Sequence, residues 1–113
     1  MAPKGYHIPS DAEWRVLIDF LGGEGKAGEK MNSTSGWIYK GNGNNSSGFN
    51  VLPGGYRDSN GWLYDITEKS YFWSSSEDSW DDACWVRFLT YDGNVYRKYF
   101  SKDNGLSVRC LRD

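Results

Sequence analysis

The sequence predicts a small α+β domain in which two short helices precede a series of short antiparallel strands. A capping box followed by an apolar stripe marks a helix near the start of the chain. Short aromatic and β-branched runs, separated by Gly, Asn and Asp turns, fill the second half. The 113 residues include 14 Gly, 6 Trp, 8 Tyr and 5 Phe, so we expect one domain whose core is built from large rings.

The first helix is expected after a short strand at residues 5–9. The Ser10 hydroxyl can accept a hydrogen bond from the amide of Glu13, whose carboxylate can reach back to the Ser10 amide. Paired glycines at 22 and 23 end the helix. One helical face carries apolar residues, which we expect to be buried: Trp14, Leu17, Ile18 and Leu21.

Residues 24–32 predict a second short helix, which two internal glycines weaken. Residues 33–50 are rich in Gly, Asn and Ser and predict a long loop anchored by Trp37, Ile38 and Tyr39. Loops of this length in compact domains usually carry function or pack on themselves. The paired glycines in residues 52–57 predict a turn.

Five strands are expected in the second half, at residues 62–66, 71–75, 83–89, 95–100 and 106–111. Asp92-Gly93-Asn94 is a strong hairpin signal between the third and fourth of them. In the last strand apolar residues alternate with Ser107 and Arg109, which predicts one buried and one solvated face.

Several segments of the chain follow one another in a characteristic order: residues 3–14, 33–37, 48–49 and 52–57 in the front half, then FWSSSE at 72–77, DGNVYR at 92–97 and GLSVRCLRD at 105–113. This order resembles the Fibrobacter succinogenes major paralogous domain. The resemblance implies a C-type-lectin-like fold, with two helices packed on short twisted antiparallel sheets, a long loop region and adjacent termini. It also implies one domain over residues 1–113, cut from a longer surface or secreted protein.

Charge and hydropathy exclude two classes of partner. The net charge is -2, and the 13 Lys and Arg are scattered among acids without a basic stripe, so we expect no nucleic-acid partner. Apolar runs do not exceed about four residues, so we expect no membrane insertion. We also expect no cofactor, and a monomer when the domain is isolated.

The two cysteines, Cys84 and Cys110, admit two interpretations. Both lie on the apolar alternate of a predicted strand, which favours buried thiols that act as small hydrophobes. A Cys84–Cys110 disulfide stays open, because the sequence does not give the separation of their Cα atoms. The family often carries a cysteine where this chain has Ala2, so Cys110 lacks the partner that the resemblance implies.

Catalysis and metal binding have little support. His7 is the only histidine, it lies inside the first predicted strand, and any Ser–His or Cys–His pair must use it, so we expect a structural role and no enzyme. Formylglycine-generating enzymes share a lectin-like core and use a cysteine pair, which makes such an enzyme a remote third interpretation. No zinc-ligand spacing is present.

Residues 77–82 carry four carboxylates, which are the ligands that Ca²⁺ prefers. Trp80-Asp81-Asp82 resembles the Trp-Asn-Asp element of sugar-binding C-type lectins. The chain has no Glu-Pro-Asn or Gln-Pro-Asp segment to complete such a site. We therefore expect a solvated acidic loop and no metal, with bound Ca²⁺ as the alternative.

Exposed Tyr, Trp and Arg suggest a recognition surface. On residues 95–100 neither alternate is purely apolar, and both faces of one sheet should not be buried in so small a domain. Tyr, Trp and Arg supply contact area and directional hydrogen bonds. The candidate surface spans residues 56–66, 78–82 and 91–98 and comprises Tyr56, Arg57, Tyr64, Trp80, Asp81, Tyr91, Tyr96 and Arg97. The alternative is that these rings only cover a thin core.

The expected function is calcium-independent binding of a protein or glycan ligand by a bacterial surface or secreted protein, outside the cell. A variable protein diversified by a retroelement is a special case of this hypothesis. The alternative is a structural module of a cell-surface protein without a ligand of its own.

Overall fold

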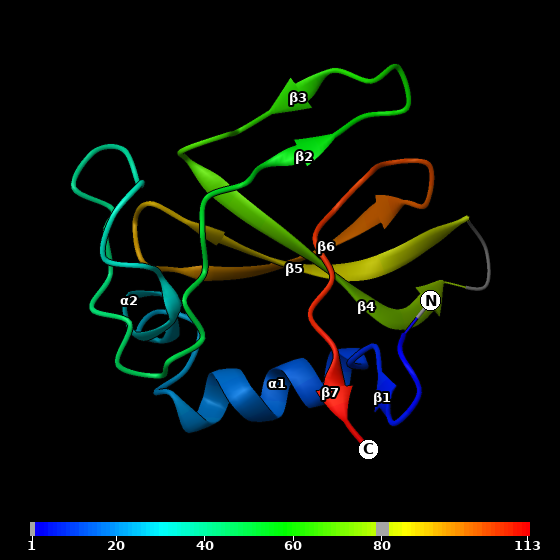
Figure 1. The fold of residues 1–113 in the computed structure, drawn as a ribbon, viewed down its shortest axis with the longest axis horizontal. Coiled ribbons are helices and arrows are strands. Elements are labelled where there is room, and N and C mark those ends of the chain that lie inside the picture. Colours follow the sequence, from blue (N-terminus) through cyan, green and yellow to red (C-terminus); the bar gives the residue numbers. More distant parts are fainter. Residues whose placement is uncertain (1, 79–81) are drawn as a thin grey trace.

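The computed structural model describes residues 2–78 and 82–113, and within them it shows two helices and short antiparallel sheets. Strands β4, β5 and β6 form a three-stranded sheet, β2 pairs with β3, and β1 pairs with β7. Helix α1 lies along one side of the three-stranded sheet, and the β2–β3 ribbon lies toward the other (Figure 1). The α+β prediction is confirmed. In chain order the elements are β1 (Tyr6–His7), α1 (Asp11–Phe20), α2 (Ala27–Met31), β2 (Tyr56–Arg57), β3 (Leu63–Tyr64), β4 (Lys69–Asp78), β5 (Ala83–Thr90), β6 (Val95–Ser101) and β7 (Leu111–Arg112).

Helix α1 begins at the predicted capping box. The Glu13 amide donates to the Ser10 hydroxyl at 3.2 Å, and the Ser10 amide donates to the Glu13 carboxylate at 3.1 Å. The helix ends before Gly22, whose φ of 108° is a conformation that glycine adopts without a Cβ clash. The predicted stripe faces inward, with Trp14, Ile18 and Leu21 buried and Leu17 partly buried.

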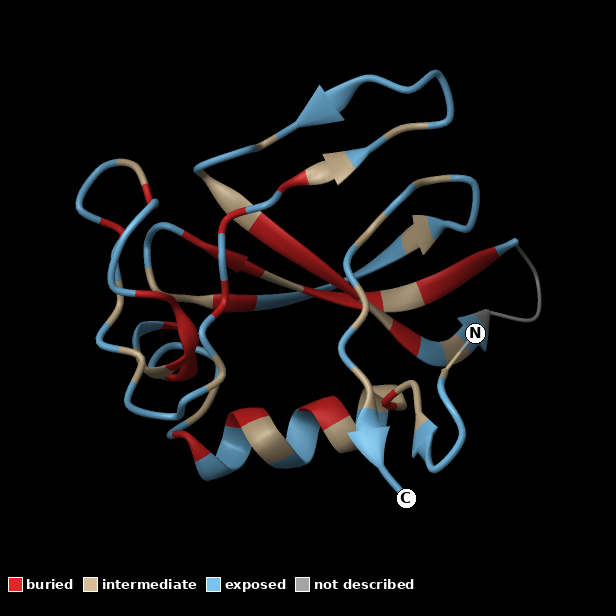
Figure 2. Cartoon of the chain, in the orientation of Figure 1, coloured by how far each residue is buried: buried red, intermediate tan, exposed pale blue. Residues whose placement is uncertain are grey.

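The main core lies between α1, α2 and the three-stranded sheet, where Figure 2 shows buried residues on the facing sides of these elements. The Trp14 ring lies 5.5 Å from that of Phe72 and 5.9 Å from that of Phe49, measured between centroids. These tilted contacts are the geometry that aromatic pairs prefer. Large rings therefore fill the core, as the composition predicts.

The long loop after α2 packs on itself and on α2. The Ser33 amide donates to the Val51 carbonyl at 2.9 Å, and the Val51 amide donates to the Met31 carbonyl at 2.8 Å. The buried Trp37 indole donates to the same Val51 carbonyl at 3.2 Å. Backbone groups that a sheet would have paired are thus satisfied locally. Of the three predicted anchors Trp37 is buried, whereas Tyr39 is 68% exposed.

Three predicted strands are shorter than expected, and the first of them, at residues 5–9, is reduced to Tyr6–His7. The strand at 62–66 is reduced to Leu63–Tyr64, and the strand at 106–111 is reduced to Leu111–Arg112. Residues 106–110 lie between the edge of β4 and β7. Ser107 bridges them to β4 by exchanging backbone hydrogen bonds with Tyr71 and Trp73 at 3.1 Å. In this segment the apolar residues 106, 108 and 110 are half-buried, and Ser107 and Arg109 are exposed. The segment forms no continuous ladder of backbone hydrogen bonds with a neighbouring strand.

The two ends of the domain meet, as predicted. Tyr6 of β1 pairs with Arg112 of β7, and His7 pairs with Leu111 (Figure 1). Among the described residues, α1 and α2 are both too short or too polar to cross a membrane.

Both cysteines are free thiols. Cys84 is buried on β5, where it lies opposite Phe100, and burial raises the pKa of its thiol. Cys110 is half-buried in the segment before β7. The structure therefore agrees with the two-thiol interpretation, although Cys110 is less buried than its strand pattern predicted.

Candidate functional site

The central strand β5 is covered on both faces. Val86 and Leu89 have no exposed surface, and Arg87 is only 2% exposed. The expectation that one sheet of so small a domain cannot be buried on both faces is wrong for this strand, because α1 covers one face and aromatic side chains cover the other. The edge strand β6 is largely exposed after Val95.

Six rings form a continuous array on the sheet face opposite α1, which we call the aromatic face. The Phe88 ring stacks on Tyr96 and on Tyr71, with centroids 5.0 Å apart in both pairs. The Tyr56 ring meets Tyr71 edge-on at 4.9 Å and stacks on Tyr64 at 5.3 Å. The face comprises Tyr56, Tyr64, Tyr71, Phe88, Tyr96 and Phe100.

The rings at the ends of this array are the most exposed, and Tyr71 in its middle is buried. Tyr64 is 43% exposed and Tyr96 is 39% exposed, whereas Tyr71 is only 4% exposed. The Tyr71 hydroxyl donates to the Asp65 carboxylate at 2.7 Å. Burial, together with this hydrogen bond, raises the pKa of Tyr71 far above its ordinary value. Tyr71 thus anchors an array whose outer rings are free to contact a ligand.

A groove opens at the Tyr96 end of the aromatic face, beside the β5–β6 turn. We call it the hairpin groove; its volume is about 320 Å³, and it is lined by Lys69, Phe88, Thr90, Tyr91, Asp92 and Tyr96. The Lys69 ammonium lies 5.7 Å from the centroid of the Phe88 ring. The groove therefore offers ring surface together with one cation and one carboxylate.

The Asp92 carboxylate joins several groups of the groove by hydrogen bonds. It accepts hydrogen bonds from the Tyr96 hydroxyl at 3.0 Å, from the Asn94 amide at 2.9 Å and from the Thr90 hydroxyl. Burial opposes ionisation of Asp92, but these bonds outweigh it and lower its pKa. The carboxylate is therefore charged at neutral pH and holds the Tyr96 ring in place.

Arg97 lies on the other face of the sheet, away from Tyr96. Its guanidinium lies 2.8 Å from the Asp11 carboxylate of α1 and 3.4 Å from the centroid of the Trp85 ring. The buried Arg87 beside it lies 3.3 Å from Glu24. The structure thus does not bring Arg97 together with the other predicted site residues, but uses it to join β6 to α1.

The remaining predicted residues are dispersed. Tyr56 and Tyr64 belong to the aromatic face, and Tyr91 lines the hairpin groove. Arg57 is exposed, and its backbone exchanges hydrogen bonds with Gly105 at 2.9 and 2.7 Å. The predicted Trp80 and Asp81 lie outside the described residues.

The acidic segment is described only in part. The carboxylates of Glu77 and Asp82 lie 2.9 and 3.5 Å from the Lys102 ammonium. Within residues 2–78 and 82–113, no three His, Cys, Asp or Glu side chains converge in a way that would hold a metal ion.

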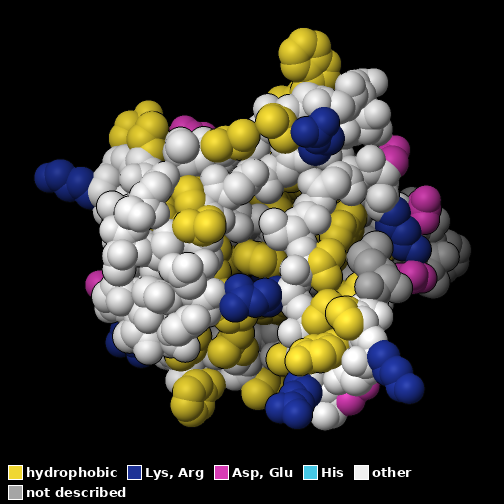
Figure 3. All heavy atoms as spheres, in the orientation of Figure 1, with side chains coloured by type: hydrophobic (Ala, Val, Ile, Leu, Met, Phe, Trp, Pro, Cys, Tyr) yellow, Lys and Arg dark blue, Asp and Glu magenta, His cyan; other side chains and the backbone are white. Residues whose placement is uncertain are grey.

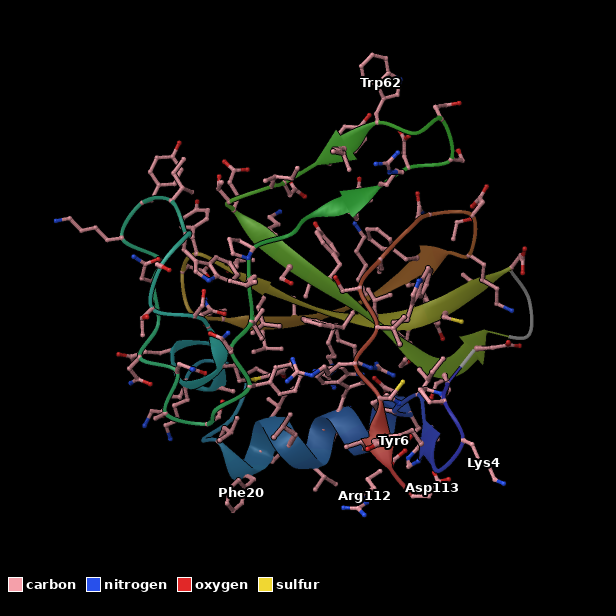
Figure 4. The ribbon with its side chains drawn as sticks, in the orientation of Figure 1. Lys4, Tyr6, Phe20, Trp62, Arg112 and Asp113 are labelled. Carbon is pink, nitrogen blue, oxygen red and sulfur yellow. The ribbon has the colours of Figure 1, made fainter. Side chains whose placement is uncertain are left out.

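Sequence reasoning missed three groove residues, Lys69, Phe88 and Thr90, because strand register brings them beside Tyr96. Asp92 lies within the predicted range 91–98 but was not among the predicted site residues. Sequence reasoning also missed that α1 exposes large apolar side chains, with Val16 70% and Phe20 84% exposed. Trp62 at the β2–β3 ribbon is 69% exposed. Figure 4 places Phe20 and Trp62 at opposite ends of the molecule, and in Figure 3 hydrophobic side chains project from the surface at the same two places.

Comparison with known proteins gives one family. The model of the family described as the Fibrobacter succinogenes major domain matches residues 1–112. No curated protein and no solved structure matches the chain.

Proposed function

The chain belongs to the Fibrobacter succinogenes major domain family, and we propose that it is a ligand-binding module with a C-type-lectin-like fold that binds without calcium. A glycan is the ligand that fits the aromatic face best, and a protein ligand is the other outcome of the test. We place the module on a bacterial surface or in a secreted protein. A reverse-transcriptase gene beside its own gene would support a retroelement-diversified variable protein.

The observation that carries this proposal is the exposed end of the aromatic face at the hairpin groove. Phe88 and Tyr96 offer stacked rings, and Lys69 and Asp92 offer charged hydrogen-bonding groups at their rim. Ligand sites typically combine apolar and aromatic walls with a few placed polar groups. Sugar rings match this combination, since their C–H faces pack on aromatic rings while their hydroxyls donate and accept hydrogen bonds.

The same geometry supports the proposal that binding does not require calcium. The groove supplies its own cation in Lys69 and its own anion in Asp92, so hydroxyl groups can be held without a metal. The chain also lacks the second sequence element of the lectin calcium site.

A glycan array and a surface-protein screen, each run in millimolar Ca²⁺ and in EDTA, test the proposal. Bound ligands should be the same in both conditions, and Tyr96→Ala should abolish binding. Tyr6→Ala is the matched control, because Tyr6 is 46% exposed but lies on the β1–β7 sheet. Binding that requires Ca²⁺, or that survives Tyr96→Ala and is lost in Tyr6→Ala, would overturn the proposal.

A structural module is a second candidate function, and the exposed Val16 and Phe20 on α1 favour it. Contiguous exposed apolar side chains often mark a surface that another protein covers. In that case no array or screen would yield a ligand for the aromatic face.

A further inference from the structure

A second cavity adjoins the hairpin groove on the other side of the β5–β6 turn. We call it the turn pocket; its volume is about 220 Å³, and it is lined by Gly25, Glu29, Lys40, Gly41, Asn42, Tyr91, Asp92 and Gly93. Tyr91 and Asp92 line both cavities. The two cavities are therefore neighbours that share one wall.

The turn pocket differs from the hairpin groove in its chemistry. Its side chains Glu29, Lys40 and Asn42 are exposed and polar, whereas the groove is walled by rings. The Asn42 side-chain oxygen Oδ1 accepts a hydrogen bond from the Trp37 backbone amide at 2.9 Å, so the side-chain NH₂ is the group left to contact a ligand. Among the residues that the structure describes, neither Glu29 nor Lys40 forms an ion pair. These three groups are thus available as hydrogen-bonding partners.

The pocket walls are held in a fixed shape. Gly41 packs so closely on Tyr91 that a Cβ would lie 2.6 Å from the Tyr91 Cβ. Behind Gly93, which also lines the pocket, a Cβ on Gly28 of α2 would lie 2.2 Å from the Gly93 carbonyl oxygen. The turn is therefore clamped between α2 and the long loop (Figure 1).

The loop beside the pocket adopts a costly backbone conformation. Tyr39 and Lys40 have φ values of 52° and 59°, in the left-handed region that residues with a Cβ rarely adopt. Residues held in this conformation are strained and are enriched at functional sites. The conformation presents the 68% exposed Tyr39 ring edge-on to Tyr91, at 5.2 Å between centroids. Tyr39 thereby supports the Tyr91 ring of the shared wall.

We propose that the hairpin groove and the turn pocket are two adjoining subsites for one linear oligosaccharide. The inference rests on the proposed function and specifies its ligand. Pockets that take a whole small ligand usually measure about 300–1,000 Å³, so the turn pocket suits one part of a longer ligand. One sugar unit packs on Tyr96, the exposed last ring of the stacked row Tyr71–Phe88–Tyr96, and the next crosses Tyr91 to reach Glu29, Lys40 and Asn42.

Calorimetric titration with β-1,4-linked gluco-, xylo- and manno-oligosaccharides of one to six units tests the inference. For at least one series, affinity should rise about tenfold from one to three units, which is the size of effect that an added group of hydrogen bonds gives. Asn42→Asp keeps the oxygen that accepts from Trp37 but removes the NH₂ group. The double variant Asn42→Asp/Glu29→Gln should lower the affinity for the trisaccharide about fivefold or more. Its affinity for the monosaccharide should be unchanged. Asp19→Asn on α1 is the matched control and should change neither.

The outcomes separate the two proposals. Affinity that does not depend on length, with Asn42→Asp and Glu29→Gln silent and Tyr96→Ala disruptive, would overturn the two-subsite inference and leave the proposed function standing. Absence of binding to every series, with a protein ligand found in the surface-protein screen, would overturn the oligosaccharide inference and the glycan class, but not ligand binding itself.

Discussion

Tyr96 and Arg97 are adjacent in sequence but lie on opposite faces of the three-stranded sheet. The Tyr96 ring stacks on Phe88 at 5.0 Å, whereas the Arg97 Nε donates to the Asp11 carboxylate at 2.9 Å. Successive side chains of a strand point to opposite faces, so this separation is a property of β6 itself. The two residues therefore have different roles, one toward a ligand and one toward α1.

Arg97→Ala should weaken the fold and leave ligand binding unchanged. It removes a partly exposed ion pair with Asp11 and a cation–π contact with Trp85, so the free energy of unfolding should fall by about 1–2 kcal/mol. Urea denaturation measures this change, and a double-mutant cycle with Asp11→Asn isolates the ion pair. Arg15→Ala is the control and should stay within about 0.5 kcal/mol. Lost binding in a fully stable Arg97→Ala variant would restore Arg97 to the recognition surface.

Trp14→Ala should cost about 3–5 kcal/mol of stability. Trp14 is 2% exposed and packs between Phe49 and Phe72, so truncation leaves a cavity in the main core. Trp62→Ala removes the same side chain at a 69% exposed position and should change stability by less than about 0.5 kcal/mol. Chemical denaturation of both variants compares them directly. Equal costs would show that Trp14 does not anchor the core.

Gly28→Ala should be strongly destabilising although it lies in a helix. Alanine favours a helix by about 1 kcal/mol over glycine. Here its Cβ would lie 2.2 Å from the Gly93 carbonyl oxygen, and overpacking of this kind costs about 3 kcal/mol, so the steric term wins. Gly54→Ala meets nothing within 4 Å and serves as the control. A Gly28→Ala variant as stable as Gly54→Ala would contradict the clamped turn.

His7 should make stability depend on pH. Its ring nitrogens lie 2.9 Å from Glu13 and 2.8 Å from Asp113, and hydrogen bonds to Glu13 and then Asp113 raise the pKa of His7 above its ordinary value of 6.5. A histidine whose pKa is higher in the folded state contributes its full stabilisation of the fold below pH 6.5. This contribution is lost as the pH rises through the folded-state pKa. The bond from His7 lowers the pKa of Glu13 from 4.5, so the Glu13 contribution is lost as the pH falls through its folded-state pKa.

The two contributions coexist between pH 4.5 and 6.5. The melting temperature of the wild type should therefore exceed that of His7→Gln most at about pH 5.5 and least at about pH 8. Thermal melts of both proteins across this range measure the difference. A difference that is constant with pH would rule out the charged form of His7 as its source.

The fold should not depend on its cysteines. Both are free, so dithiothreitol should leave the thermal midpoint unchanged, and the double variant Cys84→Ser/Cys110→Ser should still fold. The thiolate is the reactive form of cysteine, and Cys84 is 8% exposed with a raised pKa. A thiol reagent should therefore modify the half-buried Cys110 before Cys84. Unfolding on reduction alone would show that a disulfide stabilises the domain in solution.

The elements that the sequence determined by itself are those whose bonds are local. The Ser10–Glu13 cap joins residues three positions apart, and the turn at Asp92 is closed by the Asp92 carboxylate and the Asn94 amide. Such contacts depend on neighbours along the chain, so helix α1 and the β5–β6 hairpin could be predicted with their boundaries nearly correct.

The tertiary structure decided which residues form the candidate site. Alternation along β6 already separates Tyr96 from Arg97, but only the packing of α1 shows which side is covered. Lys69 of β4 and Asp92 of the turn after β5 both line the hairpin groove. Glu29 of α2 lines the adjoining turn pocket. These contacts depend on strand register and on helix docking between residues far apart in the chain. The free energy of strand pairing and helix docking comes from burial over many contacts, so it leaves no local pattern in the sequence.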